Sequence, residues 1–439
     1  MAVNPIREMV NIRARGEFAG IPSYCTANGL VIEALMEQGK RFDAPILLEA
    51  TANQVNQFGG YTGMKPADYR DFVYEIADRV GFSREKIILG GDHLGPLTWA
   101  KEPEASAMEK AKELVKLFVL AGYKKIHLDT SMRLGDDPTD QPLSDETIAR
   151  RGAELYAVCE AAWQELRKSN PDEMHPAFII GSEVPIPGGA TEAEDSVAVT
   201  KVEAFRRTVA VYRETFAKAG FNDAFDHIVG VVVQPGVEFG DDEIHHYNRE
   251  KAAELCAAAR SEAGIVLEGH STDYQSARHL REMVEDGIAI LKVGPAVTYA
   301  LREGLFALSA MERVLVPEAE RANFIETLEK VMLDAPGNWA KHYHGNDHEL
   351  WIKRKFSFSD RCRYYFALPE IEAAMDKLIA NMDKAEIPLS MLHQYMPMQY
   401  GKVRDGELPC TGRALLIDSV TVMADDYNYA VGNLNAVGR

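Results

Sequence analysis

Two histidines with acidic neighbours are the residues of this chain whose types and spacing point most directly to chemistry. His93 stands in the segment GGDHLGP and His270 in EGHSTDY, and each follows a short apolar run. Glu183 and Gln234, which carry further oxygen ligands, follow two apolar runs that lie between them. Imidazole and carboxylate groups together are a normal ligand set for Zn²⁺, Mn²⁺ and similar ions. The sequence therefore predicts one divalent metal ion bound by His93, Glu183, Gln234 and His270.

Four acidic residues near the same positions are candidates for proton transfer. Asp92 directly precedes His93, and beside a cation its carboxylate stays ionised and available as a base. The other three are Glu49, Asp129 and Asp273. A metal ion in such a place acts as a Lewis acid that polarises a ketose carbonyl and stabilises an enolate. We therefore predict acid–base chemistry on a carbonyl substrate.

Eight short apolar runs would position these residues. Most of them are apolar throughout rather than alternately, as expected of parallel strands that are buried on both faces. Amphipathic stretches separate most of them, and strands that alternate with helices predict a parallel sheet. Eight such units favour a closed (β/α)₈ barrel, since an open dinucleotide-binding sheet would need a G-x-G-x-x-G motif that the chain lacks. The predicted strands are residues 21–25, 45–48, 86–89, 125–128, 177–181, 228–233, 264–267 and 289–293.

Nearly every predicted strand is followed by a polar group or a tight glycine turn. In an α/β barrel the active site lies at this C-terminal edge, because the loops that follow the strands converge there. An isolated Asp or Asn after a strand is more often the N-cap of the next helix, and a lone His is more often an ordinary hydrogen-bonding residue. These alternatives fit poorly when six of eight strand ends carry Glu, Asp, Gln or His.

The loops after the last two strands are the predicted phosphate site. Small residues there allow backbone N–H groups to approach an anion, and a helix that starts near Thr298 offers its positive end. These loops are also the usual phosphate position in such barrels. The predicted phosphate and substrate ligands are Asn28, Ser271, Thr272, Gly294 and Thr298.

The alternation of strands and helices stops after Arg302. We predict a barrel over residues 1–305 that carries the site, and a helical C-terminal extension over residues 306–439 that packs on the barrel. No Pro/Ser-rich linker separates the two parts. The segment KHYHGNDH in the extension, with His342, His344 and His348, is a weaker candidate for metal binding because it lies outside the predicted barrel mouth.

Composition excludes some classes of protein. The net charge is −19, from 67 acidic and 48 basic residues, which argues against a nucleic-acid binder but not against small phosphorylated substrates. Five widely spread cysteines without a CxxC motif indicate reduced thiols of a cytoplasmic protein. No apolar run has the length of a signal peptide core or a membrane span. We expect a cytoplasmic homo-oligomer that contacts neither nucleic acid nor membrane.

Seven segments resemble the family of tagatose-bisphosphate aldolase Z-type subunits, which are related to the class II, metal-dependent aldolases. The resemblance covers essentially the whole chain. The segments are EATANQVNQFGGYTGM at 49–64, ILGGDHLGP at 88–96, KKIHLDTSM at 124–132, GSEVPIPGGA at 181–190, VVVQPGVEF at 231–239, EGHSTDYQ at 268–275 and ILKVGPAVTYALRE at 290–303.

The resemblance implies roles for particular residues. Asp92 and His93 resemble the base and metal ligand of the class II aldolases, and His270 resembles the ligand after their seventh strand. Gln234 stands where those aldolases carry a His ligand, and an amide oxygen binds a metal ion more weakly than imidazole does. This departure argues against conventional aldolase activity.

Two functions follow from the resemblance. Some members of the family are described as C4 epimerases of tagatose 6-phosphate or related ketoses, and others as non-catalytic partners that stabilise a class II aldolase catalytic subunit. The hydrogen on C4 of a 2-ketose is not acidic, so inversion requires either retro-aldol cleavage of C3–C4 and re-addition, or transient oxidation by a nicotinamide cofactor for which no motif is present. A kinase is disfavoured because the chain has no P-loop. We therefore predict a metal-dependent epimerase that converts D-tagatose 6-phosphate, or the related free ketose, to the fructose isomer; the alternative is the stabilising subunit of a D-tagatose-1,6-bisphosphate aldolase.

Overall fold

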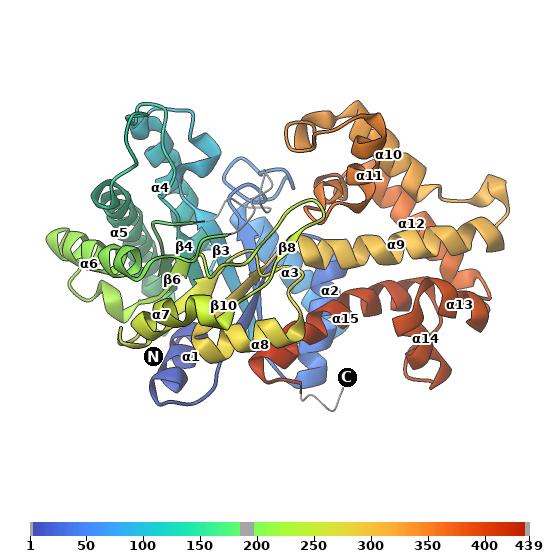
Figure 1. Ribbon diagram of the computed structural model, residues 1–439, viewed down its shortest axis with the longest axis horizontal. Helices are drawn as coiled ribbons and strands as arrows, with labels where there is room; N and C mark the ends of the chain where they lie inside the picture. Colours follow the sequence, from blue (N-terminus) through green and yellow to red (C-terminus); the bar gives the residue numbers. More distant parts are fainter. Residues whose placement is uncertain (1–2, 185–196, 435–439) are drawn as a thin grey trace.

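The eight apolar runs form the eight strands of a closed parallel barrel in the computed structural model, which describes residues 3–184 and 197–434 (Figure 1). The strands follow one another around the barrel in chain order, and β10 pairs with β1 to close it. The prediction of a (β/α)₈ barrel is thus confirmed. The barrel strands are β1 Ile21–Cys25, β2 Ile46–Thr51, β3 Ile87–Leu94, β4 Lys125–Leu128, β5 Ala177–Ile180, β6 Ile228–Val233, β9 Val266–Gly269 and β10 Ile288–Val293.

A helix follows each barrel strand, and local signals set where several of them begin. Asn28 and Ser144 accept hydrogen bonds from the free N–H groups in the first turns of α2 and α5, and Pro66 and Pro295 occupy the first positions of α3 and α9. A short antiparallel pair, β7 Glu238–Phe239 and β8 Ile244–His245, lies between β6 and α7. The helices are α2 Gly29–Phe42, α3 Pro66–Val80, α4 Glu104–Leu120, α5 Asp145–Ser169, α6 Val202–Lys218, α7 Arg249–Arg260, α8 Ala277–Asp286 and α9 Pro295–Leu315.

The inside of the barrel changes from apolar to charged along its axis. The N-terminal part of the interior is filled by residues such as Leu47, Val266 and Ile290, and helix α1 (Pro5–Ala14) packs Ile6 against them. Successive side chains of a strand alternate between the two faces, so residues two positions further along the same strands also point inward. Those positions carry charged groups, and the buried apolar layer lies on their N-terminal side.

The C-terminal extension consists of six further α-helices among the described residues. Helix α9 continues beyond the barrel and α15 returns beside it (Figure 1). Helix α15 also packs against α2 and α8, and Tyr427 on it donates to the carbonyl of Thr272, 3.0 Å away, so the end of the chain covers one side of the barrel. The predicted boundary at residue 305 lies within α9 and stays a prediction. The helices are α10 Phe324–Asp334, α11 Asp347–Phe356, α12 Pro369–Lys384, α13 Leu389–Tyr395, α14 Pro397–Arg404 and α15 Gly412–Val431.

The helices and the cysteines were also the subject of predictions from the sequence. None of the helices in the described residues has both the length and the apolar character needed to cross a membrane. All five cysteines carry free thiols.

Candidate metal centre and active site

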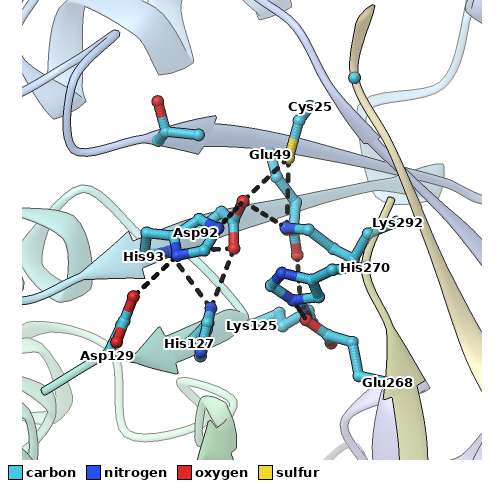
Figure 2. A network of polar contacts seen from close by, with 12 residues as sticks. Cys25, Glu49, Asp92, His93, Lys125, His127, Asp129, Glu268, His270 and Lys292 are labelled. Atoms are coloured by element: carbon cyan, nitrogen blue, oxygen red, sulfur yellow. Dashed lines mark hydrogen bonds and ion pairs between the residues drawn. The ribbon is translucent and has the colours of Figure 1, made fainter. Parts of the chain in front are cut away.

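Ten polar side chains, nearly all of them buried, form a network in the C-terminal part of the barrel (Figure 2). They come from six of the strands and from the residues that follow two of them. A buried charge is costly unless it is paired, and replacing such groups by apolar residues is often neutral or stabilising, so a network of this size indicates a role other than stability. The ten are Cys25, Glu49, Asp92, His93, Lys125, His127, Asp129, Glu268, His270 and Lys292.

Two lysines connect carboxylates of the network. Lys125 Nζ lies 2.6 Å from Glu49 Oε1 and 2.8 Å from Glu268 Oε2, and all three side chains are fully buried. Lys292 bridges Glu49 and Asp92, with its Nζ 2.6 Å from Asp92 Oδ2. Burial opposes the charge on each lysine, but the neighbouring carboxylates outweigh it and raise the pKa of both. These shifts favour the protonated form of both lysines, which is not the form that attacks a carbonyl to make an imine.

The network contains three histidines, and each has a carboxylate on one ring nitrogen. Their ring centres are 5.1, 5.1 and 5.3 Å apart, a separation that suits three imidazoles around one ion, since the nitrogen of a zinc ligand lies at about 2.0–2.1 Å from the metal. A carboxylate on the far nitrogen is the usual device that orients a metal-binding imidazole. The pairs are His93 Nδ1 with Asp129 Oδ2 at 2.7 Å, His127 Nδ1 with Asp92 Oδ1 at 3.0 Å, and His270 Nε2 with Glu268 Oε1 at 3.0 Å.

The remaining ring nitrogens and the local charge also fit a divalent cation. His127 Nε2 is buried without a hydrogen-bond partner among the described residues. Burial lowers the pKa of His270 to about 4, which leaves a neutral imidazole of the kind a metal ion needs. Burial opposes a charge on His93, but Asp92 and Asp129 outweigh it and raise its pKa, so the site attracts positive charge.

The carboxylates outnumber the lysines in this network. Four carboxylates face two ammonium groups, which leaves an excess of two negative charges when the histidines are neutral. One divalent cation would balance this excess. The donor atoms of one buried group lie within 4.8 Å of one another, and this group could hold a metal ion: Asp92, His127, Glu268 and His270.

The end of β3 brings both Asp92 and His93 into the network. The pairing of β3 with β4 shifts register between Gly91 and Leu94, and His93 has a left-handed backbone with φ 48°. Irregularities of this kind redirect side chains beside active sites. Gly90 leaves room for a neighbour, because a Cβ at that position would lie 2.6 Å from Glu49 Oε1.

The four predicted acids divide into two groups. Glu49, Asp92 and Asp129 belong to the network, and Asp129 holds His93. Asp273 is instead bound to the start of α9, where its Oδ1 accepts from the backbone N–H groups of Gly294 and Ala296 at 3.0 and 2.8 Å. Burial raises the pKa of Asp273 to about 6.

Two predicted metal ligands, Glu183 and Gln234, do not join the histidines. Gln234 Oε1 accepts from the backbone N–H groups of Gly236 and Val237 and so closes the turn after β6. Glu183 lies beyond the end of β5 and accepts from the hydroxyl of Thr200 at 2.8 Å. Local hydrogen bonds in the two loops use these side chains, so the structure does not bring Glu183 and Gln234 together with the histidines. Residues 185–190 of the corresponding family segment lie outside the described residues.

Most predicted phosphate ligands also have structural partners. Asn28 caps α2, the Thr272 hydroxyl donates to the carbonyl of Lys292, and Gly294 N donates to Asp273. Thr298 Oγ1 donates to Asp360 Oδ2 at 2.6 Å. Ser271, with φ 53°, lines the cavity beside the histidines.

A cavity lies over the network and is bounded by both parts of the chain. Its barrel side includes Asp92, His93, His270 and Lys292, and its other walls include loop residues and part of the extension. A second, larger cleft between α2, α3 and α12 borders it and shares four of its lining residues: Cys25, Gln54, Tyr61 and Arg363. A small ligand in the cavity would therefore contact the network on one side and the extension on the other.

Sequence reasoning missed several residues of the site. Lys125 and His127 are two positions apart in the short strand KIHL, and Lys292 stands in the apolar strand IAILKV. A polar residue at an inward position of an otherwise apolar strand was a detectable signal for each, because same-face residues are two apart. The histidine cluster of the extension, His342, His344 and His348, does not form a metal-binding group among the described residues, and the His348 ring stacks on Trp351.

Comparison with known proteins shows to which family this chain is related. The family model described as "D-tagatose-1,6-bisphosphate aldolase subunit GatZ/KbaZ-like" matches residues 6–432. The D-tagatose-1,6-bisphosphate aldolase subunits GatZ of Salmonella newport (strain SL254) and Salmonella typhimurium (strain LT2) are each 45% identical over 424 residues, which is 97% of this chain and 98% of theirs. A crystal structure described as a probable tagatose 6 phosphate kinase from Sinorhizobium meliloti 1021 matches with a TM-score of 0.85 and 45% identity, over 94% of this chain and 100% of that one. With agreement over nearly its whole length, the chain belongs to the GatZ/KbaZ-like family of D-tagatose-1,6-bisphosphate aldolase subunits.

Proposed function

We propose that this chain is a metal-dependent enzyme that inverts C4 of D-tagatose 6-phosphate to give D-fructose 6-phosphate, by retro-aldol cleavage and re-addition. The observation that carries the proposal is the buried network of three histidines, four carboxylates and two lysines beneath a cavity at the C-terminal end of the barrel. Removing each such ion from water costs several kcal/mol before pairing, about 20 in the idealised limit. A subunit that only stabilised a partner would not need this set of groups.

The names of the relatives support the substrate class. The GatZ relatives carry the name of a tagatose bisphosphate aldolase subunit, and the solved relative is described as a probable tagatose 6 phosphate kinase, so both names refer to tagatose phosphates. Phosphoryl transfer from a nucleotide usually needs a phosphate-binding loop, and this sequence lacks the P-loop motif. Chemistry on the carbon skeleton of the same sugar fits the network better.

We assign the metal ligands to His93, His127 and His270, with Asp92 beside them. His93 is not in the four-residue group described above, and its assignment rests on the spacing of the three rings. A divalent cation held by these groups, zinc or manganese, supplies Lewis-acid polarisation of the C2 carbonyl. Asp129 and Glu268 hold His93 and His270 by their far nitrogens and so fix the orientation of both rings.

Asp92 is the group that we assign to the proton step. Its carboxylate lines the cavity, and Lys292 Nζ at 2.6 Å keeps it ionised. Although burial opposes ionisation, the positive charges around Asp92 hold its pKa well below the usual range. In the forward direction Asp92 Oδ2 takes the proton of the C4 hydroxyl, the C3–C4 bond breaks, its electrons move toward the C2 carbonyl, and C4 becomes an aldehyde. The aldehyde turns its other face toward C3, the bond forms again, and Asp92 returns the proton to the C4 oxygen.

The first test is turnover. The purified chain is incubated with tagatose 6-phosphate, alone and with Mn²⁺ or Zn²⁺, while fructose 6-phosphate is measured. We expect product only in the presence of the metal ion, and none after chelation. Replacing Asp92 by Asn keeps the shape of the side chain and should reduce kcat at least 100-fold, because a neutral amide cannot accept the proton.

The alternative function is that of a stabilising partner for a class II aldolase catalytic subunit, and the word "subunit" in the names of the relatives favours it. In that case the chain would show no turnover by itself but would raise the activity or half-life of the catalytic subunit. Asp92→Asn would then leave the stabilisation nearly unchanged. For either function we propose a cytoplasmic location and a homo-oligomer; the free thiols suit a reducing compartment.

A further inference from the structure

One cation of the cavity wall, Arg363, forms no direct ion pair with a carboxylate of the described residues. Arg363 lies in the turn Arg361–Tyr365 of the extension and lines the cavity together with His93 and His270. Its guanidinium donates to the carbonyls of Ser359 and Asp360 and to the hydroxyl of Tyr364, and no carboxylate of the described residues lies within 4.0 Å of it. Asp360 and Asp273 act on this charge from farther away, and Asp360 is already paired with Arg302. The planar array of donors on a guanidinium matches the oxygens of phosphate and carboxylate groups.

Two other kinds of positive group at this cavity already have carboxylate partners. Lys292 is paired with Glu49 and Asp92. The backbone N–H groups of Gly294 and Ala296, at the start of α9, are occupied by Asp273. Arg363 is therefore the group of the cavity wall best placed to receive an anion.

The fold holds Arg363 in a fixed position relative to the network. Asp360, whose φ is 46°, accepts from Thr298 Oγ1 at 2.6 Å and from Arg302 Nε at 2.8 Å, so the turn is fastened to the first two turns of α9. Helix α9 directly follows β10, which carries Lys292. The ring of Tyr364 lies 5.0 Å from that of Tyr61 in the loop after β2, which links the turn to the opposite wall.

We infer that Arg363 binds the anionic end group of the substrate, and that the extension thereby completes a cavity whose reactive side belongs to the barrel. The inference rests on the proposed function, because it takes the cavity as the substrate site. The chemistry recognised is a phosphate or carboxylate at the end of a monosaccharide opposite its keto group. Arg363 is then a specificity residue that distinguishes charged from neutral sugars, and Asp360 is a positioning residue.

Binding measurements test this without relying on turnover. Isothermal titration of the Mn²⁺-loaded chain with tagatose 6-phosphate, tagaturonate and tagatose compares wild type with Arg363→Met, Arg363→Lys and Arg404→Met. The last variant removes an exposed arginine of the same extension that pairs with Asp405 and serves as the control. Arg363→Met should weaken binding of one anionic sugar about 10- to 100-fold and leave tagatose unchanged, because charge-assisted hydrogen bonds to the anion are lost. Arg363→Lys should lose less affinity for that sugar, since lysine keeps the positive charge but not the planar pair of N–H donors.

The outcomes separate this inference from the proposed function. A loss confined to tagatose 6-phosphate identifies phosphate as the anion, and a loss confined to tagaturonate identifies carboxylate; both support the inference. Wild-type binding of the sugar phosphate without turnover removes the proposed epimerase and keeps the anion subsite. If Arg363→Met binds each of the three ligands with the same affinity as wild type does, the inference is overturned. It is also overturned if Arg363→Met loses as much affinity for tagatose as for the anionic sugars. Thermal unfolding and metal content, measured for each variant, exclude misfolding as the cause.

Discussion

At the scale of single residues, the proposed metal site depends on which side chains are its ligands. The sequence pointed to Gln234 as a ligand, whereas the structure uses its side-chain oxygen to close a turn and places the unpartnered Nε2 of His127 in the network. Two substitutions distinguish these assignments. His127→Ala should lower metal affinity at least 10-fold, and Gln234→Ala should leave it unchanged.

Elemental analysis of protein purified without chelator measures both variants against wild type and a double His93→Ala/His270→Ala variant. The double variant should carry no bound metal. Metal loss in Gln234→Ala with full retention in His127→Ala would restore the ligand set predicted from sequence and remove the one assigned from the structure.

A second residue-scale prediction concerns Asp273, whose pKa burial raises to about 6. In the unfolded chain the group titrates near 3.9. The native state thus holds this proton more tightly, so the stability it contributes is complete below about pH 4 and is lost as the pH rises through about 6. A pKa difference of about two between the folded and unfolded chain corresponds to at most about 3 kcal/mol of unfolding free energy.

Asp273→Asn can accept the same two backbone hydrogen bonds but does not titrate. From pH 4 to pH 7 the unfolding free energy of wild type should therefore fall by up to about 3 kcal/mol relative to that of the variant. Urea unfolding at both pH values measures this difference. Other titrating groups cancel in this comparison. A difference in unfolding free energy that is the same at both pH values would show that Asp273 is not held in its neutral form.

At the scale of elements, the strands were predictable and the loops were not. Continuous apolar runs identified all eight barrel strands, because strands buried on both faces need apolar side chains at nearly every position. The same reasoning concealed Lys125 and Lys292, which lie inside strands rather than after them. A polar group after a strand was taken to face the barrel mouth, but in the loops of Glu183 and Gln234 nearby hydrogen bonds decide the direction of the side chain.

The end of β3 shows why local irregularity escapes such reasoning. Asp92 and His93 are adjacent and would point to opposite faces of a regular strand. They reach the same network because the register shifts after Gly91 and His93 adopts a left-handed backbone. No residue pattern in GGDHLGP specifies this shift, although its glycines are compatible with close packing around Glu49.

At the scale of the whole molecule, the extension and the barrel line one cavity. Sequence placed the extension on the barrel but gave no sign that Arg363 lines the cavity or that α15 packs between α2 and α8, since such contacts join residues far apart in the chain. The buried pair of Arg302 and Asp360 is the contact that fastens the cavity turn to α9.

Asp360→Ala should therefore destabilise the fold by about 3–5 kcal/mol, because it leaves Arg302 buried and unpaired. Chemical denaturation measures this loss. Asp405→Ala, which breaks the exposed pair with Arg404, is the matched control and should leave the unfolding midpoint unchanged. If both variants unfold at the wild-type midpoint, the turn is not held by this pair.

The central claim is that the barrel network inverts C4 by breaking the C3–C4 bond. Tagatose 6-phosphate with deuterium on C4 tests it directly, because the retro-aldol route never breaks the C4–H bond. With the Mn²⁺-loaded chain, NMR should show fructose 6-phosphate that retains the deuterium on C4. Loss of the label to solvent would contradict the retro-aldol route, and the absence of any product would contradict the catalytic function itself.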